Sequence, residues 1–381
     1  MMKKSLLLKL FAAFMALTFI VASLASCGKK SVTDGAFSEE GDLEVVGTVG
    51  DYEVLYDEFR YVVLSCKDEL ASKYGEHIWE DDAVAATYEP ELSAMVMSRI
   101  TANYAVLALC EKYGYENPLG DKENIDRVDA TIDELLYTHA INTGIRVEVS
   151  ESLSGKLKYK YEGGGLDDAY DLLREELAYL YLTERVVRLT LGVEYAFEVL
   201  INILTVGNNE VVYKDEDVAA FIESDKFICT RHIFVQNDPG ESIENNRAIA
   251  EYLLEQYNNG TPFEQLIGGK YNDDFSTPYE GAYFTRGEME TAYEDASFSL
   301  EVGEVSGIVV GEDGFYIIQR CEKNPEYMQS NFETFADQIT YAAVNTIVRE
   351  YQKTLSITLN EYGSSLVLYK IPSTWDENQE N

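Results

Sequence analysis

Histidine is scarce in this sequence, and one histidine stands in a segment whose pattern suggests a use for it. The 381 residues include three histidines, and His232 lies in the stretch CTRHIFVQND. Apolar and polar residues alternate from 228 to 235, which is typical of a half-buried strand with His232 on one face. A packed core histidine and a histidine that takes part in chemistry both fit this position. The surrounding residues must distinguish between these two roles.

The other two histidines fit structural roles better. His77 follows Gly75 in a short connection, which favours a loop or surface position. His139 shares an apolar helical stripe with Leu135 and Leu136, which favours a packed side chain. HxH, HExxH, CxxC, GxSxG, P-loop and dinucleotide patterns do not occur in the sequence. We therefore predict no metal site and no cofactor.

The segment from 227 to 323 resembles the parvulin family of peptidyl-prolyl cis-trans isomerases. Its most specific part is FTRGEMETAYEDASFSLEVGEVSGIV. In that family a histidine on the first strand faces a second histidine on the last strand. A cysteine or aspartate lies close by, and a methionine/phenylalanine shelf holds the proline ring. The resemblance implies a catalytic role for His232 and for Asp274, from YNDD. It implies a substrate-binding role for Met289, for Tyr293 in the place of the shelf phenylalanine, and for Phe284.

The sequence departs from the family at the second histidine. The family's GYHII run reads GFYII here, so Tyr316 stands in the histidine's place as the third predicted catalytic residue. A tyrosine hydroxyl can hydrogen-bond to an imidazole nitrogen, and Tyr316 also fits an ordinary strand aromatic. We predict that His232 faces Tyr316 across an antiparallel pair.

Prolyl isomerisation suits such a residue set. Rotation about the peptide bond faces a barrier of ~18–20 kcal/mol and takes tens of seconds unaided. No bond is broken, so the reaction needs no nucleophile, metal or cofactor. An apolar pocket that grips the ring and polar groups that favour the twisted amide are sufficient.

Strand alternation also places two cysteines. If His232 faces Tyr316, Cys229 faces Gln319, two residues from Cys321. Both cysteines then point to the face opposite the predicted site. Two buried thiols under a helix are favoured over a disulfide between them. For the remaining pair in the helical half, Cys66 and Cys110, the sequence leaves the disulfide state open.

The elements that must hold this segment predict an α+β fold. A parvulin-like domain (225–324), a small antiparallel sheet with surrounding helices, is inserted between a mainly helical SurA-type chaperone region (43–224) and a returning helix and strand (325–381). The strands LEVVGTVG and YEVLY open the helical region, and Asp57 is expected to cap the first helix. LDDAYDLLREELAYLYLTERVVRLTL is expected to be helical, LVLYKIP to be the last strand, and the tail from Ser373 to be disordered.

The N-terminus predicts export. Two lysines precede an apolar run that ends in Leu-Ala-Ser-Cys, which resembles the lipobox of bacterial lipoproteins. Residues 1–26 are then a lipoprotein signal peptide, Cys27 carries the lipid, and 27–42 form a flexible tether. An uncleaved membrane anchor with an incidental cysteine is the alternative. Both readings place the rest of the chain outside the cytoplasm.

The net charge of −38 argues against nucleic acid as a partner. The domain order resembles PrsA-type foldase lipoproteins and the periplasmic chaperone SurA. That resemblance implies a lipid-anchored, extracytoplasmic isomerase and foldase whose partners are unfolded or secreted polypeptides. A client-binding chaperone with a catalytically weak parvulin domain is the first alternative. A solute-binding lipoprotein is the second alternative. The sequence lacks the two-lobe α/β pattern that is expected of that class.

Overall fold

A computed structural model gives the structure of most of the chain between residues 44 and 372. The described residues are 44–151, 157–179, 181–237, 242–274, 277 and 280–372. The predicted signal peptide, the tether with Cys27, and the predicted disordered tail lie outside them.

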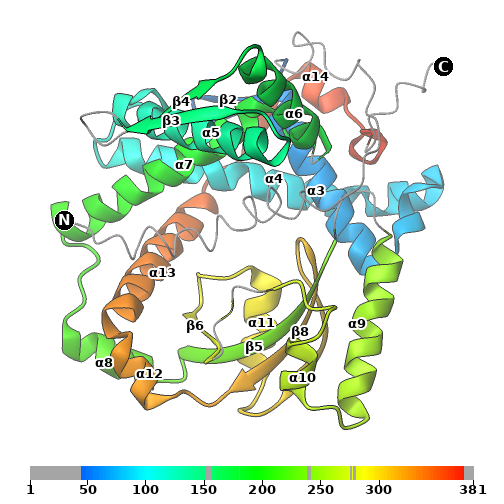
Figure 1. Cartoon of the computed structure of the whole chain (residues 1–381), viewed down its shortest axis with the longest axis vertical. Coiled ribbons are helices and arrows are strands. Elements are labelled where there is room, and N and C mark those ends of the chain that lie inside the picture. Colours follow the sequence, from blue (N-terminus) through cyan, green and yellow to red (C-terminus); the bar gives the residue numbers. More distant parts are fainter. Residues whose placement is uncertain are drawn as a thin grey trace.

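A helical region is built on a small sheet that joins the two ends of the described chain (Figure 1). The sheet has the order β2-β1-β9, and both pairings are antiparallel. Gly47 is needed there, because a Cβ at this position would lie 2.6 Å from the carbonyl oxygen of Thr358. The elements of this region are β1 (Val45–Val49), β2 (Tyr52–Leu55), α3 (Tyr56–Tyr74), η2 (Glu76–Trp79), α4 (Asp82–Lys112), η3 (Pro118–Gly120), α5 (Lys122–Asn142), α7 (Glu184–Asn202), η4 (Ile203–Gly207), β9 (Ile357–Leu359), α14 (Glu361–Ser365) and η5 (Leu368–Lys370).

Helices α4 and α7 form much of the core of this region. Both are long and apolar enough to cross a membrane by length and composition, but half of each apolar stretch is buried inside the fold. Their buried residues include Ile100, Leu107 and Leu200, which belong to one continuous apolar cluster. The apolar character of these helices is thus explained by core packing.

The segment between α5 and α7 differs from the predicted run of helices. A hairpin of β3 (Val147–Glu151) and β4 (Leu157–Tyr161) precedes α6 (Gly165–Tyr179). The predicted single helical stretch is therefore wrong, because α6 and α7 are separate helices. The break occurs where the Thr183 hydroxyl caps α7 by accepting the N–H of Val186 at 3.2 Å.

The start of α3 also differs from its prediction. Leu55 occupies the N-cap position and makes no side-chain cap. Asp57, the predicted cap, lies inside the first turn and is 3% exposed. Its carboxylate accepts hydrogen bonds from Arg185 Nε at 2.8 and 3.0 Å and from the Thr183 hydroxyl at 2.8 Å. The carboxylate also accepts the first-turn N–H of Glu58 at 2.8 Å, so the side chain both stabilises the start of α3 and joins α3 to α7.

The isomerase-like segment forms a four-stranded antiparallel sheet of order β6-β5-β8-β7 (Figure 1). Helix α11 packs on the face that carries Ile228 and Ile318. Helices α9 and α10 cover part of the other face, around Ile233 and Phe315. The α+β class is confirmed. Its elements are β5 (Phe227–Gln236), α9 (Ile243–Asn258), α10 (Phe263–Ile267), β6 (Ala282–Thr285), α11 (Thr291–Ser299), β7 (Val305–Val310) and β8 (Gly314–Cys321).

Two connections join this sheet to the helical region. Helix α8 (Asp215–Glu223) leads into β5, and α12 (Pro325–Ser330) with α13 (Phe332–Gln352) leads back. In Figure 1, α13 runs from the sheet to the helical region. There Val344 and Val348 join the core, and the Tyr341 ring packs edge-on against Phe197 with centroids 5.1 Å apart.

The predicted last strand, LVLYKIP, is wrong. Residues 368–370 form the 3-10 turn η5, and the last strand is β9, farther toward the N-terminus. The Glu89 carboxylate accepts the N–H groups of Leu368 and Tyr369 at 2.9 and 3.0 Å. Because this side chain takes up the backbone donors that a strand would pair, the segment turns.

Candidate active site

His232 lies near the middle of β5, on the face covered by α11. Its side chain is 11% exposed, and its Nε2 lies 2.9 Å from Oδ2 of Asp274, whose side chain is 10% exposed. The two predicted catalytic residues thus meet at the surface of the sheet. The carboxylate is oriented in turn by Thr277, whose hydroxyl and backbone N–H both donate to it.

A buried amide holds the Asp274 segment against β5. Asn272 is 3% exposed, and its side-chain oxygen accepts the N–H of Phe234 at 2.9 Å. Its side-chain nitrogen donates to the carbonyl of Asp274 at 2.9 Å and to that of Ile267 at 3.0 Å. The position of Asp274 therefore depends on Asn272, two residues before it in the NDD run. The sequence analysis did not identify this role of Asn272.

Tyr293 completes a chain of hydrogen bonds through the imidazole. Its hydroxyl lies 2.8 Å from His232 Nδ1 and 2.8 Å from the Thr230 hydroxyl. Burial raises the pKa of Tyr293 far above its usual value, so the hydroxyl keeps its proton. A carboxylate can only accept, so Nε2–H donates to Asp274, and Nδ1 accepts from Tyr293. The contacts thus define one tautomer of the neutral imidazole.

Tyr316 meets the site through its ring. It stacks on Phe234 with centroids 4.5 Å apart and lies edge-on to His232 at 5.4 Å. The predicted pairing is wrong, because Phe234 faces Tyr316 and His232 faces Ile318. This two-residue shift keeps every side chain on its predicted face. The sequence allowed a hydrogen bond between the Tyr316 hydroxyl and the imidazole of His232. In the structure, the hydroxyl of Tyr293 makes the hydrogen bond to that imidazole.

The predicted substrate-binding residues lie at different depths. Phe284 is 0% exposed and Tyr293 is 3% exposed, so both form the floor beneath the site. Met289 is partly buried and packs against the same cluster. Of the three, Met289 therefore has the side chain most available to a substrate, and contact with Phe284 would require its neighbours to move.

The loop that carries Met289 is held by one carboxylate. Glu294, from the first turns of α11, is 3% exposed. It accepts the N–H groups of Gly287, Glu288 and Met289 at 2.6, 2.9 and 3.0 Å. Gly287 has φ +101°, a conformation that side chains rarely adopt. Glu294 and Gly287 therefore shape the loop that presents the methionine.

The same loop is also held from outside the isomerase-like sheet. Asn345 of α13 donates to the carbonyl of Gly287 at 2.5 Å. Arg349, one turn farther along, donates to the carbonyl of Met289 at 3.3 Å and lies 3.8 Å from the Glu294 carboxylate. The helix that enters the core of the helical region thus contacts the backbone of the predicted substrate shelf.

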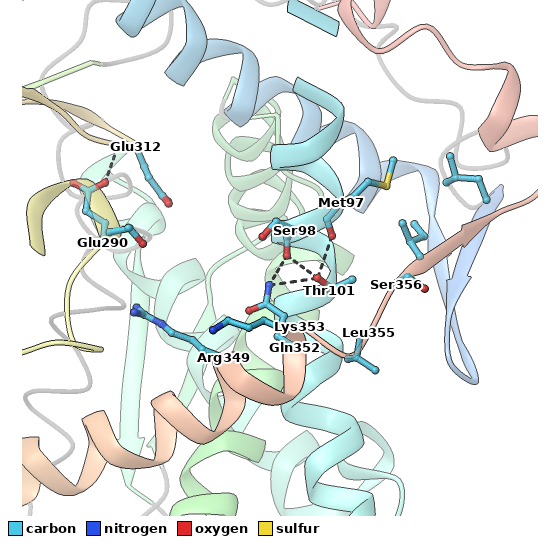
Figure 2. A pocket seen from close by; sticks show the side chains of 13 residues that line it. Met97, Ser98, Thr101, Glu290, Glu312, Arg349, Gln352, Lys353, Leu355 and Ser356 are labelled. Atoms are coloured by element: carbon cyan, nitrogen blue, oxygen red, sulfur yellow. Dashed lines mark hydrogen bonds between the residues drawn. The ribbon is translucent and has the colours of Figure 1, made fainter. Parts of the chain in front are cut away.

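A pocket of about 660 Å³ lies beside this contact, between the sheet and the helical region. Figure 2 shows Arg349 of α13 and Lys353, which follows the end of that helix, in the pocket with Glu290 and Glu312 across from them, and Met97 on α4. Burial raises the pKa of Glu290 to about 7. This pocket opens at the junction of the two regions.

The remaining candidates lie apart from this constellation. His77 is exposed, and its Nδ1 lies 2.6 Å from Glu80. His139 is buried in α5, where desolvation lowers its pKa. Cys229 and Cys321 are free and face each other directly across β5 and β8, which corrects the predicted pairing of Cys229 with Gln319.

The isomerase-like segment matches a known family. Residues 221–324 match the family described as PPIC-type PPIASE domain. Peptidyl-prolyl cis-trans isomerase pin1 of Schizosaccharomyces pombe is 37% identical over 81 residues, which cover 21% of this chain and 46% of that protein. The solved structure of NmPin, the parvuline of Nitrosopumilus maritimus, is 31% identical and covers 26% of this chain and 97% of that chain, with a TM-score of 0.21.

A longer match reaches beyond this segment. Foldase protein PrsA of Bacillus subtilis is 26% identical over 260 residues, which cover 64% of this chain and 84% of that protein. The chain spans about half the length, or less, of several other relatives that it matches, among them a Chaperone SurA of Chromohalobacter salexigens.

The chain therefore carries a domain of the parvulin class of peptidyl-prolyl cis-trans isomerases, at residues 221–324. Beyond that domain its likeness is to the PrsA foldases. The predicted resemblance to parvulin-type, PrsA/SurA-like foldases is confirmed.

Proposed function

We propose that this chain is an extracytoplasmic, lipid-anchored peptidyl-prolyl cis-trans isomerase and foldase that assists secreted polypeptides. The observation that carries the proposal is the contact of His232 with Asp274 and Tyr293, on a parvulin-type sheet and near Met289. The N-terminal signal and the lipobox cysteine Cys27 support the location, and the likeness to PrsA and SurA supports polypeptide clients.

The proposed mechanism lowers the rotational barrier without covalent chemistry. Met289 packs against the prolyl ring of the client and limits its motion relative to the sheet. His232, with its tautomer set by Asp274 and Tyr293, offers a fixed dipole beside the bond that rotates. Such a prearranged polar group favours the twisted amide, which has lost its resonance, over the planar amide.

A protease-coupled isomerisation assay on proline tetrapeptides tests the activity. We expect the wild-type chain to accelerate isomerisation. The kcat/KM of His232→Ala should be about 10- to 100-fold lower than that of the wild type. Losing an imidazole–carboxylate hydrogen bond is worth about 1.5–3 kcal/mol, and each 1.4 kcal/mol is a factor of ten. His77→Ala is the matched control, because that histidine is exposed and lies outside the site. A wild-type chain without acceleration would refute the isomerase proposal.

The location requires its own experiment. Metabolic labelling with a radioactive fatty acid in a bacterial host should label the wild-type chain and leave Cys27→Ala unlabelled. A wild-type chain that stays unlabelled, or a Cys27→Ala chain that still incorporates label, contradicts lipid attachment at this residue.

A client-binding chaperone with a weak isomerase domain is the second candidate. Tyr316 favours this candidate, because it stands in the place of the family's second histidine. Among the described contacts, Tyr316 meets His232 through a perpendicular ring contact. In this case His232→Ala should leave the suppression of client aggregation unchanged. Loss of suppression in that variant, with His77→Ala unaffected, would count against a client site separate from the isomerase site.

A further inference from the structure

Two thiols lie directly opposite each other at the centre of the isomerase sheet. Cys229 of β5 is the register partner of Cys321 of β8. Cys229 is three residues from His232, so its side chain points to the opposite face of the sheet. On that face it belongs to an apolar cluster with Phe335 and Ile339 of α13, and Cys321 packs against the cluster.

The pairing satisfies the backbone requirement for a disulfide. Directly opposite residues in an antiparallel pair have Cα atoms about 4.5–5.5 Å apart, and disulfides span about 4.4–6.8 Å. The pairing predicted from the sequence had offset the two cysteines by two residues. The register of β5 and β8 removes that offset.

The surroundings give the two thiols different chemistry. The pKa of Cys321 is lowered to about 6 by a hydrogen bond from the Cys229 thiol and by the Arg231 guanidinium, while burial opposes the shift. Cys321 is also partly exposed, whereas Cys229 is fully buried. A thiolate beside a cation is the reactive form of cysteine.

The other two described cysteines are fully buried, and burial outweighs the effect of the Arg99 guanidinium beside Cys66. Cys66 and Cys110 are both 0% exposed. Burial raises the pKa of each thiol to about 12, so both remain protonated and unreactive. They provide an internal reference for any reaction at the pair in the sheet.

We propose that Cys229 and Cys321 are a redox-active dithiol that closes to a disulfide by exchange with a small-molecule or protein disulfide. The Cys321 thiolate attacks one sulfur of the oxidant, forms a mixed disulfide and releases the first thiolate. Cys229 then loses its proton to solvent and attacks the Cys321 sulfur, which releases the second thiolate. The pair is oxidised by two electrons, and the oxidant's disulfide is reduced to two thiols.

The bond would connect the two strands that form the site. Its closed loop spans about 90 residues, a length at which a cross-link strongly restricts the unfolded chain. β5 and β8 carry His232 and Tyr316 on the opposite face, so the disulfide would fix the register on which their contact depends. The proposal does not depend on isomerase activity.

Peptide mapping of the full-length chain, purified in detergent, tests the proposal. The folded protein is incubated with excess glutathione disulfide, acid-quenched, unfolded and alkylated before digestion. We expect a linked peptide that joins Cys229 to Cys321, with Cys66 and Cys110 recovered as alkylated thiols. Recovery of Cys229 and Cys321 as free thiols, or linkage of either one to another cysteine, overturns the proposal.

Single variants test the order of the two steps. With Cys229→Ser, Cys321 should accumulate a mixed disulfide with glutathione. With Cys321→Ser, Cys229 should remain reduced in the native protein, because it is fully buried. The reverse pattern contradicts the assigned roles. In a separate measurement, the oxidised protein should unfold at a temperature roughly 10 °C above that of the reduced protein, and equal temperatures would refute a cross-link between the strands.

Discussion

Replacing Glu294 by alanine should loosen the loop that carries Met289. The Glu294 carboxylate is the acceptor for three consecutive backbone N–H groups, those of residues 287–289. Alanine supplies no acceptor, and the neighbouring Arg349 guanidinium, 3.8 Å from the carboxylate, would lose its charged partner. The substitution removes these contacts without adding bulk to the site.

The magnitude follows from the burial of the three donors. The bond from Gly287 is buried, and leaving its N–H unpaired costs about 1–3 kcal/mol. The bonds from Glu288 and Met289 are partly buried, so water can replace part of each, and their loss costs about 0.5–1.5 kcal/mol each. We expect a total loss of about 4 kcal/mol in the free energy of unfolding, which most domains survive.

Two measurements check this prediction. Urea unfolding gives the free energy, and amide hydrogen exchange at residues 287–289 reports the loop itself, where protection should fall. If the chain is an isomerase, kcat/KM should fall at least about tenfold, because the shelf residue is no longer held in place. Asp295→Ala is the control, since this neighbour on α11 makes only an exposed pair with Arg286. Unchanged exchange and an unfolding free energy within about 0.5 kcal/mol of wild type would refute the reasoning.

Further predictions concern charges and hydroxyls inside the fold. Burial raises the pKa of Glu58 to about 7, so its contribution to stability is complete below its ordinary pKa near 4.5 and is lost as the pH rises to 7. Glu58 should contribute about 3 kcal/mol to the fall of the free energy of unfolding over this window, and Glu58→Gln should remove that part of the fall. The carboxyls of Asp68, Glu194 and Glu290, whose pKa burial also raises to about 7, should titrate in both proteins. Arg185→Ala should cost about 3–5 kcal/mol in urea unfolding, because the buried Asp57 carboxylate loses its cation. Tyr293→Phe should cost about 1–3 kcal/mol in the free energy of unfolding and lower kcat/KM, because His232 Nδ1 loses its hydrogen-bond partner.

Each of these predictions has a contradicting result. A pH profile identical in wild type and Glu58→Gln would mean that Glu58 is not the titrating group. Arg174→Ala, whose ion pair with Asp171 is exposed, should cost at most about 1 kcal/mol. An equal cost in Arg174→Ala and Arg185→Ala would show that burial is not decisive. An unaltered unfolding free energy and kcat/KM in Tyr293→Phe would remove Tyr293 from the imidazole network.

The faces of the strands could be predicted from the sequence, but the pairing between strands could not. Side chains alternate with a period of two, so His232 and Cys229 were placed on opposite faces from the pattern alone. A shift of two residues preserves every face, and no pattern of apolar residues detects it. The register that aligns Cys229 with Cys321 and Phe234 with Tyr316 is set by contacts along the whole of β5 and β8.

The role of Tyr293 was missed for a related reason. The resemblance placed it on the shelf because the family has phenylalanine there, and only its ring was considered. The added hydroxyl was the available signal, since a buried phenol normally requires a hydrogen-bond partner. Asp57 shows a different case, in which a residue that bonds to the first turn of its helix also makes a long-range ion pair with Arg185 that local sequence cannot indicate.

The sheet that joins the two ends of the described chain has a consequence for synthesis. β1 emerges from the ribosome early, but its partner β9 follows about 300 residues later, and Asn360 bonds to the carbonyl of Val45. At ~5–20 residues per second, the first strand waits roughly 15–60 seconds for its neighbour. The isomerase unit is contiguous in sequence and ends at residue 324, about 33 residues before β9 begins. The protein that is proposed to assist other chains thus exposes an unpaired strand edge of its own until β9 has been made.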